Sequence, residues 1–133
     1  MGFNAIFDRL TINQDSSVAI FGGGGTARAA LAALDGLVNN ISVYQRSEKR
    51  NDLVKNAVSL SSVNLHDFNM LNEISGYSLI VSTLPSTASE VVVAKIPTEL
   101  RADQVFLDVA YSPFPSSPSI AWQKAGGVVI DGV

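Results

Sequence analysis

The sequence predicts an α/β fold, a doubly wound parallel sheet of about six strands in the order 3-2-1-4-5-6. Short apolar runs alternate with helical patterns along the chain, which is typical of a parallel sheet covered by helices on both faces. Right-handed crossovers between such strands lead to the doubly wound order. Of the 133 residues, 47% are hydrophobic and 16% are charged, so we expect residues 1–133 to form one domain with a buried core.

Strands are expected where short runs of apolar and β-branched residues stand between turn signals. The run SVAIF is the first of these. The run YSLIV is apolar apart from one serine and a tyrosine hydroxyl, as in a strand that is buried on both faces. In chain order, the strands are expected at residues 17–21, 41–44, 63–65, 77–81, 104–109 and 127–130.

Helices are expected where apolar side chains recur every three or four residues. The helix after the first strand carries Leu31, Leu34 and Leu37 at this spacing. Ser47 stands where it can cap the next helix. In chain order, the helices are expected at residues 2–10, 25–37, 47–58, 68–74, 86–94 and 117–124.

Four consecutive glycines join the first strand to the helix after it. Read as G-x-G-x-x-A, the segment fits the dinucleotide-binding fingerprint of the Rossmann fold. Gly22 permits the tight turn, Gly24 lets a pyrophosphate approach the backbone, and Ala27 allows close helix packing. An ordinary glycine-rich turn is the alternative, but the flanking strand and helix favour a pyrophosphate site at the helix start. The residues expected to hold it are Gly22, Gly23, Gly24, Gly25, Thr26 and Ala27.

The segment after the second strand indicates NADP as the cofactor. An NAD site usually has Asp or Glu at this point to bind the ribose hydroxyls, and this chain has Gln45 instead. Arg46 and Arg50 can bind a 2′-phosphate, and Ser47 adds a donor. A solvated basic helix start would have the same composition, but its place in the predicted fold favours a ligand contact.

Composition excludes several other classes of protein. The net charge of −3 gives no support for nucleic-acid binding. The absence of cysteine rules out disulfides, and a single histidine makes a zinc site unexpected. The sequence has no apolar run of membrane-spanning length and no secretory signal, so we expect a cytoplasmic protein without membrane partners.

Five motifs in register carry a family resemblance. GGGGTARA follows the first strand, QRSEKR the second, VSTLPS the fourth and DVAYSP the fifth, and DGV ends the chain. Shikimate dehydrogenases typically show GAGGAARA, NRTxxR, NATPLGM, DVVYNP and DGxxML at these places. Over nearly its whole length, the chain is therefore similar to the C-terminal, NADP-binding domain of that family.

The resemblance implies an enzyme that reduces 3-dehydroshikimate to shikimate with NADPH, in the biosynthesis of aromatic amino acids. Tyr111 is expected on the substrate side, with simple packing as the alternative reading. Leu84 stands where the family usually has Thr. The cofactor contacts that the resemblance adds are Ser82, Thr83, Leu84, Val109 and the backbone of Gly132.

In this family the catalytic Lys and Asp belong to an N-terminal domain, and the chain shows nothing that resembles it. We therefore expect a truncated part of a two-domain enzyme that has no catalytic residue of its own and is inactive alone. It would dock on its N-terminal catalytic domain. The alternatives are the nucleotide domain of a quinate/shikimate dehydrogenase or a glutamyl-tRNA reductase, and a non-catalytic NADP-binding module.

Overall fold

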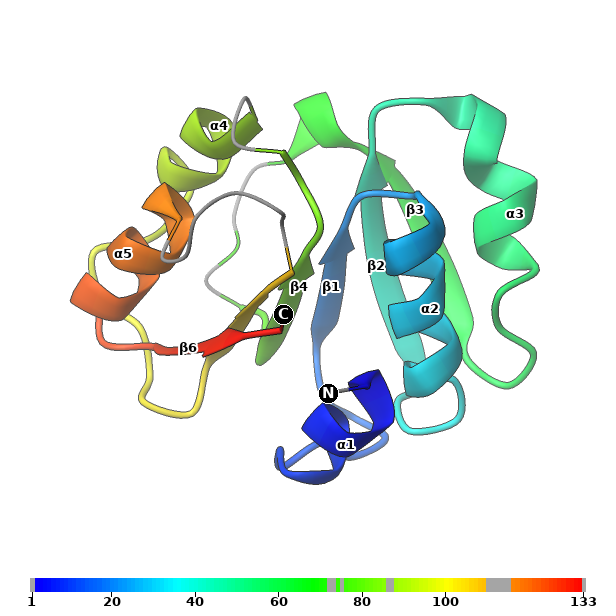
Figure 1. Cartoon of the computed structure of the whole chain (residues 1–133), viewed down its shortest axis with the longest axis horizontal. Helices are drawn as coiled ribbons and strands as arrows, with labels where there is room; N and C mark the ends of the chain where they lie inside the picture. Colours follow the sequence, from blue (N-terminus) through cyan, green and yellow to red (C-terminus); the bar gives the residue numbers. More distant parts are fainter. Residues whose placement is uncertain (1, 72–73, 75, 86–87, 110–115, 133) are drawn as a thin grey trace.

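The computed structural model describes residues 2–71, 74, 76–85, 88–109 and 116–132 of the chain. Six strands of this part form one all-parallel sheet in the order β3-β2-β1-β4-β5-β6 (Figure 1). This order confirms the predicted doubly wound α/β fold. The strands are β1 (Val18–Phe21), β2 (Asn40–Gln45), β3 (Ser62–Asp67), β4 (Leu79–Ser82), β5 (Val105–Asp108) and β6 (Val128–Asp131).

Both faces of the sheet are buried under helices. Because side chains alternate along a strand, Val18 and Ile20 of β1 enter one core while Ala19 and Phe21 enter the other. Helices α1, α2 and α3 cover the first core, and η2, α4 and α5 cover the second, on opposite sides of the sheet in Figure 1. The helices are α1 (Phe3–Asp8), α2 (Gly25–Leu34), η1 (Glu48–Arg50), α3 (Asn51–Lys55), η2 (Phe68–Met70), α4 (Ser89–Val93) and α5 (Ser117–Lys124).

Helix α2 ends three residues before the predicted position. Asp35 leaves the helical conformation at ψ 122°, and Gly36 follows with φ +84°, a conformation that favours glycine. The Asp35 carboxylate accepts hydrogen bonds from the backbone N–H groups of residues 59–61, at 2.8–2.9 Å. These long-range bonds stop the helix, so the prediction that Leu37 belongs to its apolar face is wrong, and Leu37 is 42% exposed.

The single helix expected over residues 47–58 is divided in two. Ser47 caps the 3-10 turn η1, accepting a hydrogen bond from the Lys49 N–H at 3.3 Å, and α3 then ends at Lys55. Of the helix expected over residues 68–74, the described part forms only the 3-10 turn η2, and residues 72–73 lie outside it. Residues 86–87, at the expected start of α4, also lie outside the described part. Segments this short are not stable helices by helix propensity alone, so tertiary contacts decide where each helix begins and ends.

Candidate functional site

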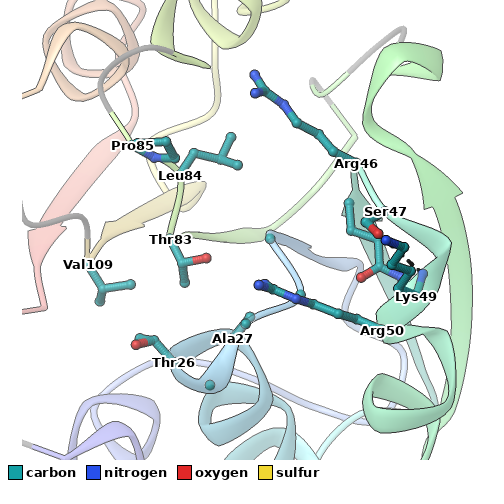
Figure 2. Close-up of a pocket in the computed structure, with 15 residues that line it drawn as sticks. Thr26, Ala27, Arg46, Ser47, Lys49, Arg50, Thr83, Leu84, Pro85 and Val109 are labelled. Carbon is teal, nitrogen blue, oxygen red and sulfur yellow. Dashed lines mark hydrogen bonds between the residues drawn. The ribbon is translucent and has the colours of Figure 1, made fainter.

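A pocket of about 480 Å³ opens at the carboxyl ends of β1, β2, β4 and β5, and we call it the glycine-loop pocket. In a doubly wound sheet this edge is where ligands bind, because the strand order reverses there. Its volume falls in the range of small-molecule sites, roughly 300–1,000 Å³. Figure 2 shows the pocket. It is lined by Gly22, Gly23, Gly24, Gly25, Thr26, Ala27, Gln45, Arg46, Ser47, Lys49, Arg50, Thr83, Leu84, Pro85 and Val109.

Gly22 makes the turn out of β1 for two separate reasons. Its φ of +114° is a conformation that side chains with a Cβ rarely adopt. A methyl group at this position would also overlap the Thr83 hydroxyl oxygen. The turn is secured on the other side by the Gly22 N–H, which donates to the Tyr44 carbonyl oxygen at 2.8 Å. The first glycine of the motif is thus required by both its backbone and its surroundings.

The next two glycines let the loop pack closely against side chains that follow β2. A methyl group on Gly23 would overlap Gln45 Oε1, and one on Gly24 would approach the Arg50 guanidinium to 3.1 Å. Arg28 of α2 stabilises the loop, because its guanidinium donates a hydrogen bond to the Gly23 carbonyl oxygen at 3.3 Å. No side chain caps the start of α2, which leaves its first N–H groups open to an anion.

Three cationic residues stand at the end of β2. Arg46, Lys49 and Arg50 all line the pocket, and the described lining contains no Asp or Glu. Figure 2 shows Arg50 reaching across the pocket toward the start of α2, whereas Arg46 points away from the glycine loop. The Arg46 guanidinium lies over the Phe68 ring, 5.8 Å from its centroid. This end of the pocket suits a ligand that carries more negative charge than a pyrophosphate alone.

Gln45 closes the pocket between the glycine loop and α3. It is 7% exposed, and its Nε2 donates a hydrogen bond to Asn51 Oδ1. Its Oε1 has no hydrogen-bond partner among the described residues. The position that carries a carboxylate in many NAD sites is therefore taken by a neutral amide with one unused acceptor.

The opposite end of the pocket is formed by the residues that follow β4 and β5. The Thr83 hydroxyl donates to the Phe21 carbonyl oxygen at 2.8 Å, and the Thr83 N–H donates to the same oxygen at 3.0 Å. Because the Thr83 hydroxyl proton is used in this hydrogen bond, the hydroxyl oxygen can only accept a hydrogen bond from a ligand in the pocket. Leu84, Pro85 and Val109 supply apolar surface at this end.

Two of the predicted contacts do not line the pocket. Ser82 is buried within β4, at 5% exposure. Gly132 lies behind Val109: its N–H donates to the Asp108 carbonyl oxygen at 2.9 Å, and a methyl group on it would overlap Val109 Cγ1. Tyr111 lies outside the described residues. All other predicted cofactor contacts come together in the glycine-loop pocket.

Sequence reasoning missed three residues of this region. Lys49 lines the pocket because η1 turns it inward, whereas it was expected only as part of a helix. Pro85 lines the opposite end. Asn51 binds Gln45 across the start of α3, and a six-residue separation gives no periodic signal of such a contact. The cationic run itself was the signal that could have included Lys49.

The charged side chains of the described pocket lining are Arg46, Lys49 and Arg50, all from the segment after β2. The described lining also contains Ser and Thr hydroxyls but no Asp, Glu or His. His66 lies elsewhere, in β3, where it stacks on the Tyr44 ring with a centroid distance of 4.7 Å. In the part of the chain that the structure describes, no group of three His, Cys, Asp or Glu side chains could hold a metal ion. No helix there is long and apolar enough to cross a membrane.

No family model and no curated protein matches this chain. Solved structures do. A shikimate dehydrogenase from Mycobacterium tuberculosis is 26% identical with a TM-score of 0.72, over 89% of this chain and 44% of its own. A quinate dehydrogenase from Corynebacterium glutamicum, in complex with NAD, is 21% identical with a TM-score of 0.74, over 98% of this chain and 49% of its own.

The 5-ketofructose reductase of a Gluconobacter strain is also similar in fold, at 16% identity and a TM-score of 0.76, over 98% of this chain and 50% of its own. The chain therefore spans about half the length of the solved structures that it matches. The likenesses below 25% identity concern the fold alone. Together with the pocket, the likeness to the mycobacterial enzyme supports a nucleotide-binding domain of a dehydrogenase.

Proposed function

We propose that this chain binds NADP(H) in the glycine-loop pocket, as the nucleotide-binding domain of a shikimate dehydrogenase that reduces 3-dehydroshikimate to shikimate. One observation carries the proposal: at the end of β2 the described pocket lining holds Arg46, Lys49 and Arg50 and no carboxylate, and Arg50 reaches toward the glycine loop. A 2′-phosphate needs cations at this place, whereas ribose hydroxyls are usually bound by an acid.

The residues present fit the proposed cofactor. Gly23 and Gly24 let the loop pack closely against Gln45 and Arg50, and no side chain caps the start of α2, so a pyrophosphate can reach the backbone N–H groups there. Arg50 and Lys49 would bind the 2′-phosphate, and Ser47 would add a hydroxyl donor. Thr83 offers an acceptor at the other end, where the carboxamide of a nicotinamide has donors to give.

When bound, the nicotinamide would supply the hydride for reduction of a ketone to an alcohol. This chain would orient the nicotinamide ring, because Val109 and Leu84 present apolar surface to the pocket. Gly132 packs against the Val109 side chain. Lys49 stands beside Arg50 at the β2 end of the pocket, and apart from it the described lining has no Asp, Glu, His, Lys or Tyr that could protonate an alkoxide. We propose that this proton donor and most of the substrate pocket lie on a second domain, with Tyr111 on the side of the substrate.

Calorimetric titration of the chain with NADP⁺ and with NAD⁺ tests the proposal. We expect NADP⁺ to bind at least tenfold more tightly, since one charge-assisted hydrogen bond contributes about 1.5–3 kcal/mol. Arg50→Ala should remove about tenfold of the NADP⁺ affinity and leave that for NAD⁺ nearly unchanged. Equal affinities of the unmodified chain for the two nucleotides would contradict the assignment.

Arg101→Ala is the matched control variant. Arg101 is an exposed arginine outside the pocket lining, and it pairs with Asp103 at 3.1 Å on the surface. The substitution removes the same charge from the chain without touching the site. If it weakens NADP⁺ as much as Arg50→Ala does, the effect comes from net charge and not from a phosphate contact.

A further inference from the structure

The amide of Gln45 is the feature of the pocket that the roles above leave unexplained. Gln45 lines both the glycine-loop pocket and a smaller pocket of about 110 Å³ beside it. Its Nε2 donates to Asn51 at the start of α3, and its buried Oε1 has no partner among the described residues. A buried acceptor without a donor is destabilising, so a donor that arrives with a ligand would satisfy it.

The unused acceptor lies against the glycine loop. A methyl group on Gly23 would overlap Gln45 Oε1, which places this oxygen beside the loop that we propose for the nucleotide. A ribose hydroxyl is a donor that fits such an oxygen, whereas a phosphate monoester has mainly acceptors to offer. This orientation of the amide therefore suits a 2′-hydroxyl, although Lys49 and Arg50 suit a 2′-phosphate.

Asn51 can remove this conflict because its amide carries both a donor and an acceptor. If both amides turn over, Asn51 Nδ2 donates to Gln45 Oε1, and Gln45 Nε2 faces the glycine-loop pocket as a donor. Asn51 also lines the smaller pocket, where solvent can satisfy whichever of its groups points outward. The hydrogen bond between the two side chains is kept in either orientation.

We propose that Gln45 and Asn51 form a reversible amide pair that adapts to either a hydroxyl or a phosphate at the 2′ position of the ribose. In one orientation the pair accepts from a 2′-hydroxyl, and in the other it donates to a 2′-phosphate, with Asn51 as the positioning residue. The cations then set the preference for the phosphate, while the pair avoids a penalty for either group. This inference rests on the proposed function, since it takes an adenine nucleotide as the ligand.

Substitution of Asn51 tests the pair with three nucleotides: 5′-AMP, 2′,5′-ADP and 3′,5′-ADP. In Asn51→Asp the carboxylate can only accept, so it holds Gln45 Nε2 and leaves Oε1 facing the ligand. We expect 2′,5′-ADP to weaken about tenfold more than 3′,5′-ADP, the size of one lost charge-assisted hydrogen bond. The loss for 3′,5′-ADP measures the charge of the new aspartate, because the two ligands carry the same charge.

Asn51→Leu supplies the contrast, because it releases Gln45 to turn either way. We expect Asn51→Leu to change the affinities for 5′-AMP and 2′,5′-ADP by the same factor, since no partner then fixes which group of Gln45 faces the ligand. A selective loss of 2′,5′-ADP in Asn51→Leu, or an equal loss of the two ADP isomers in Asn51→Asp, would overturn the inference.

The unmodified chain gives a second readout that does not depend on how the variants fold. In ¹H–¹⁵N spectra, the side-chain NH₂ resonances of Asn51 should move with 2′,5′-ADP, as Nδ2 becomes a donor to Gln45, and should stay nearly in place with 5′-AMP. Identical responses to both ligands overturn the amide pair alone, if Arg50-dependent binding of 2′,5′-ADP is present. If neither nucleotide binds, the proposed function fails, and the pair fails with it.

Discussion

Gly22→Ala tests whether the turn out of β1 depends on glycine for the reasons that the structure gives. At φ +114° an alanine is strained by about 1–2 kcal/mol or more, as for left-handed backbone generally. Its methyl group would also overlap the Thr83 hydroxyl oxygen, and overpacking of this kind costs about 1–3 kcal/mol. We therefore expect the free energy of unfolding to fall by about 2–5 kcal/mol.

A double-mutant cycle separates the two contributions. Thr83→Ala removes the hydroxyl oxygen that the new methyl group would overlap, so Gly22→Ala should cost less in that background, by about 1–3 kcal/mol. Thr83→Val is the matched control, because it keeps the volume while removing the hydrogen bond to the Phe21 carbonyl oxygen. Urea denaturation followed by the fluorescence of Trp122, the single tryptophan of the chain, measures each variant.

Two outcomes would refute this reasoning. A loss below about 0.5 kcal/mol, the usual size of a neutral surface change, would mean that the turn tolerates a Cβ. Equal rescue by Thr83→Ala and Thr83→Val would mean that no steric contact joins residues 22 and 83. In either case, the geometry of the loop floor on which the proposed pyrophosphate site rests would be wrong.

Three further predictions concern stability and activity. Asp35→Asn should lower the thermal midpoint of unfolding at pH 7, because backbone hydrogen bonds from residues 59–61 stabilise the Asp35 carboxylate and lower its pKa from 3.8 to about 2. The difference in midpoint between the variant and the unmodified chain should shrink as the pH falls from about 4 toward 2. A group with a lowered folded-state pKa stabilises the fold above its unfolded pKa and loses that contribution in acid, so a constant difference across this range would contradict the cause. Trp122→Phe should reduce the free energy of unfolding by about 1–3 kcal/mol, because it leaves a cavity and removes the hydrogen bond from the indole Nε1 of the fully buried Trp122 to the Gln104 carbonyl oxygen (3.1 Å). Urea denaturation followed by far-ultraviolet circular dichroism measures this loss, and an unchanged free energy of unfolding would be evidence against the packing of Trp122. The purified 133-residue chain should not oxidise shikimate with NADP⁺ in a spectrophotometric assay, and turnover would disprove the need for a second domain.

The pocket-lining residues on single loops could be predicted because their signals are local. The glycine run and the cationic run each follow an apolar strand, and parallel strands bring their carboxyl ends to one edge. Ser82 and Gly132 were assigned as contacts from a motif alone. The structure buries Ser82 within β4 and packs Gly132 against Val109, since a motif gives the strand end but not which groups around it face the pocket.

Helix ends were the least predictable part of the fold. Leu37 continues the apolar spacing of α2 in the sequence, yet the helix stops at Leu34, because Asp35 binds backbone groups some 25 residues further along the chain. The helix after β2 is likewise divided between η1 and α3. Contacts at such separations leave no periodic pattern in the residues that make them.

The sequence by itself determined the sheet order and the place of the glycine-loop pocket, because apolar strands, glycine turns and amphipathic helices are encoded over a few consecutive residues. Only the tertiary structure decided which side chains share the pocket. Lys49 enters it through a 3-10 turn, and Gln45 meets both Gly23 and Asn51. These contacts depend on how β2, α3 and the glycine loop pack together, and packing is set by three-dimensional volume rather than by spacing along the chain.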